Sequence, residues 1–93
     1  MYAVIFSSQR RSYENEEYEQ AAKRMFELAT SQPGFVSVNS VRDAQGKGIT
    51  ISYWETLDAI KNWKSHPEHA TIQQKGKRDW YASFEIKICE VIR

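Results

Sequence analysis

The order in which two hydrophobic periods follow each other along the chain constrains the fold more than any other feature. Strand-like patterns, rich in β-branched and aromatic residues, cover residues 2–8, 35–43, 49–55 and 80–92. A helical period instead governs residues 16–31 and the segment that starts after Thr56. The predicted order is therefore strand, helix, strand, strand, helix, strand. This order is typical of the ferredoxin-like α+β fold, a βαββαβ arrangement in which an antiparallel sheet carries both helices on one face.

Signals for chain reversal separate these segments. The tripeptide QPG at 32–34 ends the first helix, because the residue before a proline resists the helical conformation and a glycine turns the chain readily. The loop AQGKG at 44–48 joins two alternating segments, which predicts a β-hairpin. Thr56 is a favoured helix N-cap, and the helix that it starts carries Leu57, Ile60 and Trp63 on one face.

A proline divides the second helical segment. Pro67 disfavours helical geometry at His66 and suits the first turn of a new helix, which we expect to stop at Gly76. His66 then lies at the joint, and His69 lies in the first turn, pointing inward with Ile72. A helix N-terminus and burial both disfavour the imidazolium ion, so we predict a neutral His69 with a lowered pKa.

The first strand is apolar on both faces, which is typical of a strand that is covered on both sides. Tyr2, Val4 and Phe6 form one face, and Ala3 and Ile5 form the other. The pattern favours a sheet whose second face meets another copy of the chain.

The third predicted strand can also be divided into a face towards the helices and a face towards another copy of the chain. Ile49, Ile51 and Tyr53 are predicted to face the helices, and Trp54 is predicted to face away and to contribute to a contact between copies. A solvated second face is the alternative, since antiparallel sheets commonly leave one face wet.

Length and charge exclude several classes of protein. The 93 residues suffice for one domain, and 13 basic residues against 12 acidic ones give a net charge of +1 without a basic stripe. We therefore predict no nucleic-acid partner. No apolar run approaches the ~20 residues of a membrane span, and no signal-peptide pattern opens the chain. These features predict a cytoplasmic protein without a membrane partner.

The candidate metal ligands and nucleophiles do not form a site. Pro67 breaks the helical register between His66 and His69, and the single cysteine, Cys89, is distant from both in sequence and lies within a predicted strand. No glycine-flanked serine elbow is present. We predict no metal and no nucleophilic catalysis.

Three stretches carry a resemblance to a known family. QPGFVSV, GITISYWETLDAIKNWKSHPEH and the terminal strand closely resemble the antibiotic biosynthesis monooxygenase (ABM) domain of the dimeric α+β barrel superfamily. The resemblance implies a single ABM-like domain over residues 1–93 and a homodimer in which two ferredoxin-like sheets join into a barrel. It also implies a pocket between each sheet and its own helices.

The resemblance further implies a small cofactor-independent monooxygenase that acts on an electron-rich aromatic, such as a quinol- or anthrone-like ring. In relatives the tryptophan equivalent to Trp63 lines the pocket. The residues predicted to contact the ring are Trp63, Tyr53, Met25 and Phe26. His69 or His66 is predicted to transfer the proton. A purely structural role is the alternative for both histidines, for Trp63 and for Tyr53.

Two other functions fit the same fold. One is a ligand-binding or stress-response dimer without turnover. The other is a haem-degrading oxygenase, but the position that would carry the histidine of that branch is Gln73. The first strand likewise offers Ser7 and Ser8 where that branch has an asparagine. We therefore predict that the protein works without haem or another cofactor.

Overall fold

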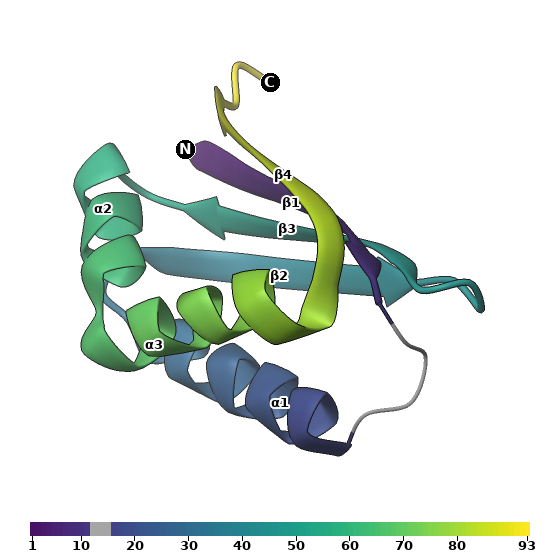
Figure 1. Cartoon of the computed structure of the whole chain (residues 1–93). Helices are drawn as coiled ribbons and strands as arrows, with labels where there is room; N and C mark the ends of the chain where they lie inside the picture. The colour runs from purple at the N-terminus through teal and green to yellow at the C-terminus, as the bar shows by residue number, and fades with distance from the viewer. Residues whose placement is uncertain (12–15) are drawn as a thin grey trace.

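The structure is a computed structural model that describes residues 1–11 and 16–93 (Figure 1). Its strands are β1 (Tyr2–Arg10), β2 (Phe35–Arg42), β3 (Lys47–Trp54) and β4 (Tyr81–Glu90). Its helices are α1 (Glu16–Thr30), α2 (Leu57–Ser65) and α3 (Pro67–Lys75), and the π-turn η1 (Gly76–Trp80) follows α3. The predicted order of elements is confirmed, including the division of the second helical segment at Pro67.

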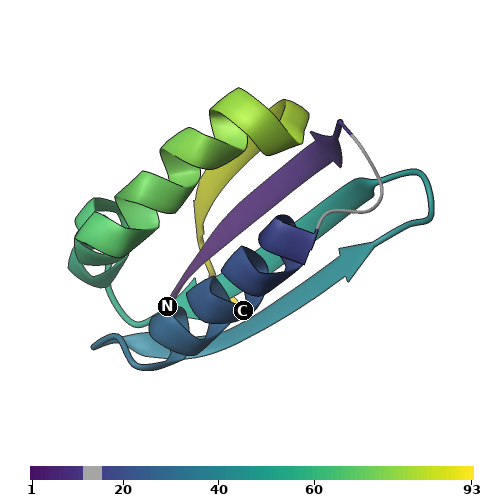
Figure 2. The same cartoon turned by 60° about the horizontal axis from the view of Figure 1, so that its bottom comes forward.

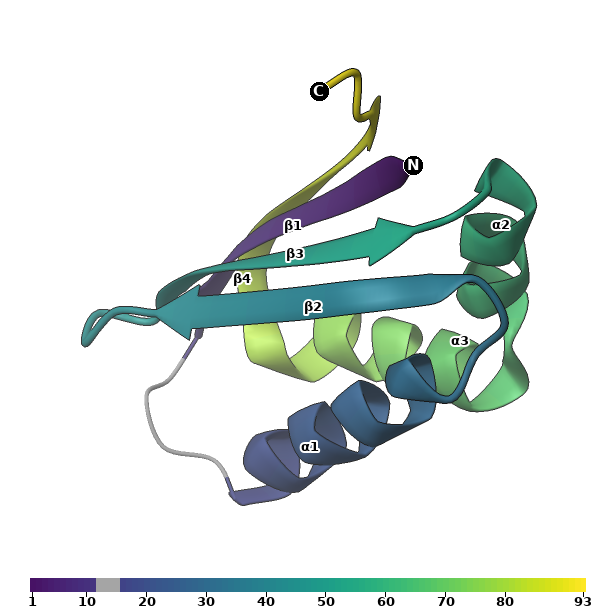
Figure 3. The same cartoon turned by 180° about the vertical axis from the view of Figure 1, so that it is seen from behind.

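The strands form one antiparallel sheet in the order β2-β3-β1-β4. Figures 1 and 3 show α1, α2 and α3 on the same side of this sheet. The architecture is thus the predicted ferredoxin-like α+β fold. Tyr2 pairs with both Trp54 and Glu90, so these three residues lie on one face, and directly opposed partners elsewhere in the sheet share a face in the same way. We call the face under the helices the helix side and the other face the open side.

Local capping signals position α2 and α3. The Thr56 side chain accepts a hydrogen bond of 3.0 Å from the backbone N–H of Ala59 and so starts α2. His66 ends α2 and also caps α3, because its Nδ1 accepts the Glu68 N–H at 3.3 Å. Pro67 occupies the first turn of α3, where its missing N–H costs nothing.

Trp54 lies on the helix side, which corrects the sequence-based assignment. It is fully buried against Ala59 and Ile60 of α2, and the Phe35 ring meets it edge-on at 5.6 Å. Since side chains alternate along β3, Tyr53 points to the open side. The prediction that Tyr53 faces the helices is therefore wrong.

Polar side chains explain this reversal. The indole Nε1 of Trp54 donates to Ser52 Oγ at 2.9 Å, and the hydroxyl oxygens of Ser40 and Thr50 lie 2.7 Å apart. Because these groups satisfy one another, the helix side tolerates them. The more apolar row of β3, which includes Ile49, is left on the open side.

The start of β4 also differs from the prediction. Trp80 is buried in η1 instead of belonging to the last strand. The helix α3 ends at Lys75 with Gly76 as its C-cap, as predicted, but Gly76 keeps helical angles (φ −59° and ψ −47°) and begins the π-turn. A Cβ atom at Gly76 would lie 2.9 Å from the Tyr81 ring, so this glycine provides space. A register shift between Gln9 and Arg10 accompanies the placement of Tyr81 on the helix side, although strict alternation predicts the open side.

Candidate functional site

The rings of Trp63 and His69 lie flat against each other where α2 meets α3. Their centroids are 3.9 Å apart with an interplanar angle of 13°, and Trp63 also stacks on Trp54 at 6.2 Å. The break at Pro67 produces this contact, because it lets the first turn of α3 fold back onto the last turn of α2. Both Trp63 and His69 remain half-buried. We call this pair of rings the aromatic platform.

His69 is held in one tautomer by the backbone. Its Nδ1 lies 2.9 Å from the carbonyl oxygen of Trp63. Because a carbonyl only accepts, Nδ1 carries the proton of the neutral ring and Nε2 keeps a lone pair. Burial lowers the pKa of His69, while the hydrogen bond to Trp63 opposes this shift. The predicted direction is confirmed, and the ring is a neutral base near pH 7.

His66 has a different setting from His69. Its Nδ1 is occupied by the Glu68 N–H, and its ring lies 6.0 Å from the Trp63 ring at 48°. The structure therefore brings both predicted histidines to the same tryptophan, but only His69 stacks on it.

An apolar surface adjoins the platform on the helix side. Val4 of β1 pairs with Ile88 of β4, and Phe6 pairs with Ile86. Val4 also packs against the buried cluster around Trp54. Figure 2 shows β1 running between α1 and α3, and the side chains of Ile86 and Ile88 keep 46% and 52% exposure. We call Val4, Phe6, Ile86 and Ile88 the apolar floor.

Long side chains join the two helices that flank this floor. Arg24 of α1 makes two hydrogen bonds, of 2.6 and 3.0 Å, to the Glu68 carboxylate of α3. Glu17 of α1 pairs with Lys75 of α3. The hydrogen bond from Arg24 is the main reason that the pKa of Glu68 is lowered.

The remaining residues predicted to contact the ring are not gathered at one place. Met25 is half-buried on α1, whereas the next residue, Phe26, is 53% exposed. Consecutive helical residues point in different directions, so the two cannot share one face. Tyr53 lies on the open side, away from the platform. The exposed position of Phe26 does not favour its predicted contact with a ligand, which stays a prediction.

A group of phenols and guanidinium ions was not anticipated from the sequence. Arg42 Nη2 donates to the Tyr18 hydroxyl at 3.1 Å and to Ser8 Oγ at 3.0 Å. The Tyr81 hydroxyl donates to that of Tyr18 at 3.3 Å, and the Arg10 guanidinium lies 3.8 Å from the Tyr18 ring centroid. Tyr18 lies within the helix predicted over residues 16–31, but no sequence signal pairs it with residues so distant along the chain.

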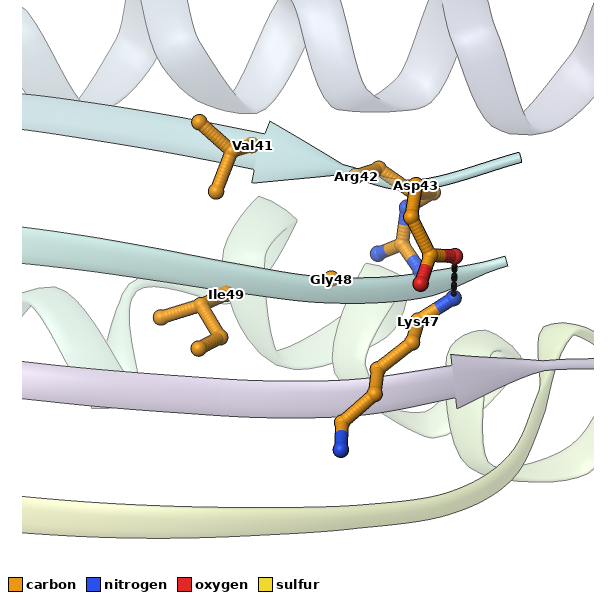
Figure 4. A pocket seen from close by; sticks show the side chains of 6 residues that line it. All are labelled: Val41, Arg42, Asp43, Lys47, Gly48 and Ile49. Carbon is orange, nitrogen blue, oxygen red and sulfur yellow. Dashed lines mark hydrogen bonds between the residues drawn. The ribbon is translucent and has the colours of Figure 1, made fainter. Parts of the chain in front are cut away.

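Two hollows lie around the open side, near the β2–β3 hairpin. One of about 320 Å³ is lined by Val41, Arg42, Asp43, Lys47, Gly48 and Ile49 (Figure 4). The other, of about 440 Å³, is lined by Ser7, Ser8, Gln9, Lys47, Ser83, Phe84 and Glu85. Neither hollow is lined by a residue predicted to contact the ring or to transfer a proton.

Two further properties concern only residues 1–11 and 16–93. There, no group of three or more histidine, cysteine and acidic side chains is arranged to hold a metal ion. Among the helices of this part of the chain, none combines the length and the apolar character that crossing a membrane requires.

The fold and the platform define a small ferredoxin-like α+β protein with an aromatic, imidazole-bearing site beside its sheet. Residues 1–75 match the model of the antibiotic biosynthesis monooxygenase family, and the chain belongs to that family. The chain is 48% identical over 92 residues to the uncharacterized protein YqjZ of Bacillus subtilis (strain 168), covering 99% of this chain and 80% of YqjZ.

Solved structures share the fold at low sequence identity. SnoaB, a cofactor-independent oxygenase from Streptomyces nogalater, matches with a TM-score of 0.82 at 16% identity, over 99% of this chain and 93% of its own. Rv0793 from Mycobacterium tuberculosis matches with a TM-score of 0.85 at 12% identity, over 99% of this chain and 95% of its own.

Proposed function

We propose that the protein is a cofactor-independent monooxygenase that oxidises an electron-rich aromatic ring, such as a quinol or an anthrone, bound on the helix side. The observation that carries this proposal is the stacked, neutral His69, whose Nδ1 is fixed by the Trp63 carbonyl and whose Nε2 keeps its lone pair. The family match and the fold shared with SnoaB support the reaction class.

The reaction needs no external reductant. For an anthrone-type CH₂ group, His69 Nε2 accepts one proton and leaves a carbanion stabilised by the ring. The carbanion reduces O₂, one oxygen atom becomes the new carbonyl and the other leaves as water. The substrate supplies all four electrons, so the balance closes with O₂ alone.

The site residues have distinct tasks in this proposal. The substrate ring lies over the apolar floor and against Trp63, with Met25 as a wall on the α1 side. His69 acts as the general base. His66 is the second candidate, and its occupied Nδ1 makes it the weaker one.

Oxygen uptake with a panel of quinols and anthrones tests the proposal. We expect uptake above the buffer rate with at least one compound, and a loss of about 10²-fold or more in His69→Gln. His66→Asn keeps a helix cap and should retain most of the rate. Tyr53→Phe, on the open side, is the matched control. Absence of uptake with every compound would contradict the proposal, and binding without uptake would favour the ligand-binding alternative.

We further propose that the protein works as a homodimer joined through the open side. Val41 and Ile49 lie there with 71% and 40% exposure, and Ile5 and Tyr53 share the same face. An exposed apolar sheet face of this kind favours a partner over water. The resemblance to the dimeric α+β barrel superfamily makes a second copy the expected partner.

A further inference from the structure

A hydrogen-bonded chain of two phenols and a guanidinium lies at the end of β1 opposite the platform. Tyr2 pairs with Trp54 at the platform end, and Arg10 pairs with Tyr81 at the other end. Tyr81 donates to Tyr18, which also accepts from Arg42. Among the described residues, the acidic side chains that form ion pairs do so with cations other than Arg42. The oxygen atoms that accept from Arg42 are neutral ones.

Two glycines make room for Arg42 and Tyr81, the residues at the two ends of this hydrogen-bonded phenol chain. A Cβ atom at Gly48 would lie 2.6 to 2.9 Å from three atoms of the Arg42 guanidinium. A Cβ atom at Gly76 would lie 2.9 Å from the Tyr81 ring. The π-turn and the register shift lie beside Tyr81. The phenol chain therefore depends on these two irregularities of the backbone and on the absence of a side chain at both glycines.

The direction of the hydrogen bonds fixes what the Tyr81 hydroxyl can do. Arg42 can only donate, so the Tyr18 oxygen acts as an acceptor for it and for the Tyr81 proton. The Tyr81 oxygen has then used its proton and keeps lone pairs. Burial and the hydrogen bond to Tyr18 raise the pKa of Tyr81, so this phenol stays protonated. Its remaining capacity is to accept a hydrogen bond.

The apolar floor connects the phenol chain to the platform. Phe6 meets the Tyr81 ring edge-on at 5.4 Å, and Val4 packs against the buried cluster around Trp54. Val4 and Phe6 are two residues apart on β1, which corresponds to about 7 Å. A flat ring system that covers this floor would therefore reach towards His69 at one end and Tyr81 at the other.

Building on the proposed function, we propose that the Tyr81 hydroxyl is a second oxygen-binding group of the site. It accepts a hydrogen bond from a ring hydroxyl at the end of the ligand opposite to the atom that reacts near His69. Tyr18 and Arg42 are positioning residues, because Tyr18 accepts the Tyr81 proton and Arg42 holds the Tyr18 oxygen by donating to it. The ligand class is thus a ring with a free hydroxyl at its far end, which a quinol or the enol (anthrol) tautomer of an anthrone carries, and an ether or a ketone carbonyl there cannot make this bond.

Binding under argon, where no turnover occurs, tests this inference with two ligands, naphthohydroquinone and its mono-methyl ether. We expect the wild-type protein to bind the diol about tenfold more tightly than the ether, the value of one hydrogen bond. In Tyr81→Phe, which keeps the ring contacts, the two affinities should become equal. Tyr53→Phe on the open side should keep the tenfold ratio.

The positioning residues are tested by the same ratio, which a purely structural defect would not change because it weakens both ligands alike. Arg42→Met and Gly48→Ala should lower the ratio, and Arg42→Lys should restore part of it. Equal affinities in the wild type, or an unchanged ratio in Tyr81→Phe, overturn the inference while leaving the proposed function intact. If the wild type binds neither ligand, the proposed function fails and this inference fails with it.

Discussion

The two histidines show how one proline separates the roles of neighbouring residues. Pro67 makes His66 a cap, with its Nδ1 on the Glu68 N–H, and turns the His69 ring onto Trp63. His69 therefore keeps Nε2 as a base while its other nitrogen is fixed. The placement of both residues at this joint was predictable from the sequence, because proline geometry is local.

The pH dependence of stability follows from the His69 environment. The pKa of His69 is lowered from the ordinary value of 6.5, so the unfolded chain takes up a proton more readily than the folded one. We expect the free energy of unfolding to fall as the pH drops below about 6.5, until the folded pKa is passed. His69→Gln can still donate to the Trp63 carbonyl, and it should flatten this part of the curve.

Urea unfolding between pH 8 and pH 5, at one fixed protein concentration, measures this effect. The comparison at pH 8, where both proteins are uncharged at this position, gives the cost of lost packing alone. If the free energy of unfolding falls equally steeply with pH in the wild type and in His69→Gln, the account of His69 is contradicted.

The error at Tyr53 and Trp54 shows where reading single residues fails. Alternation predicted that the two point to opposite faces, but the sequence does not say which face the helices cover. The more apolar row, with Ile49, was assigned to the inside. The structure buries Trp54 instead, because Ser52 accepts from its indole N–H and α2 packs on its ring. Such pairing becomes visible only with the tertiary contacts.

At the scale of elements, the turn that follows α1 is tied to α2 through a glycine. Gly34 has φ 84°, and a Cβ atom there would lie 2.6 Å from the Cβ of Ala59. Gly46 in the β2–β3 hairpin has φ 87°, but its closest neighbour would be the flexible Gln9 amide at 3.2 Å. The two glycines therefore share a backbone requirement and differ in the space around them.

Replacing each glycine by alanine separates these effects. Both variants should lose about 1–2 kcal/mol from the left-handed backbone conformation. Gly34→Ala should lose about 1–3 kcal/mol more, since it overpacks the contact with α2. Chemical denaturation of the two variants measures the difference, and Ala59→Gly should rescue part of the loss in Gly34→Ala but none in Gly46→Ala. Equal losses of unfolding free energy in Gly34→Ala and Gly46→Ala would contradict the expected extra cost of overpacking at Gly34.

The order of elements and most of their ends were predictable, because they follow from period and capping, which are local. The η1 turn was not. The end of α3 before Gly76 was predictable, but the π-turn that begins at Gly76 depends on the Tyr81 ring, which packs against this glycine. The register shift between Gln9 and Arg10, and with it the phenol chain, likewise depends on contacts between distant segments.

At the scale of the whole molecule, the open side should join two copies. Val41→Glu places a charge on the most exposed apolar residue of that face, and it should weaken the dimer by more than about tenfold in Kd. Leu57→Glu is the matched control, because Leu57 is 53% exposed but lies on α2. Sedimentation velocity at micromolar concentration measures both. A wild-type monomer, or equal dissociation of both variants, would contradict the proposed interface.

The central claim is that an aromatic ligand binds on the helix side, over the apolar floor and against the platform. Methyl groups on both faces of the sheet report on it directly. In a methyl NMR titration with naphthohydroquinone under argon, the account predicts shifts at Val4, Ile86 and Ile88, with Val41 and Ile49 unchanged. Shifts confined to Val41 and Ile49, or no shift at any of these methyl groups, would contradict it.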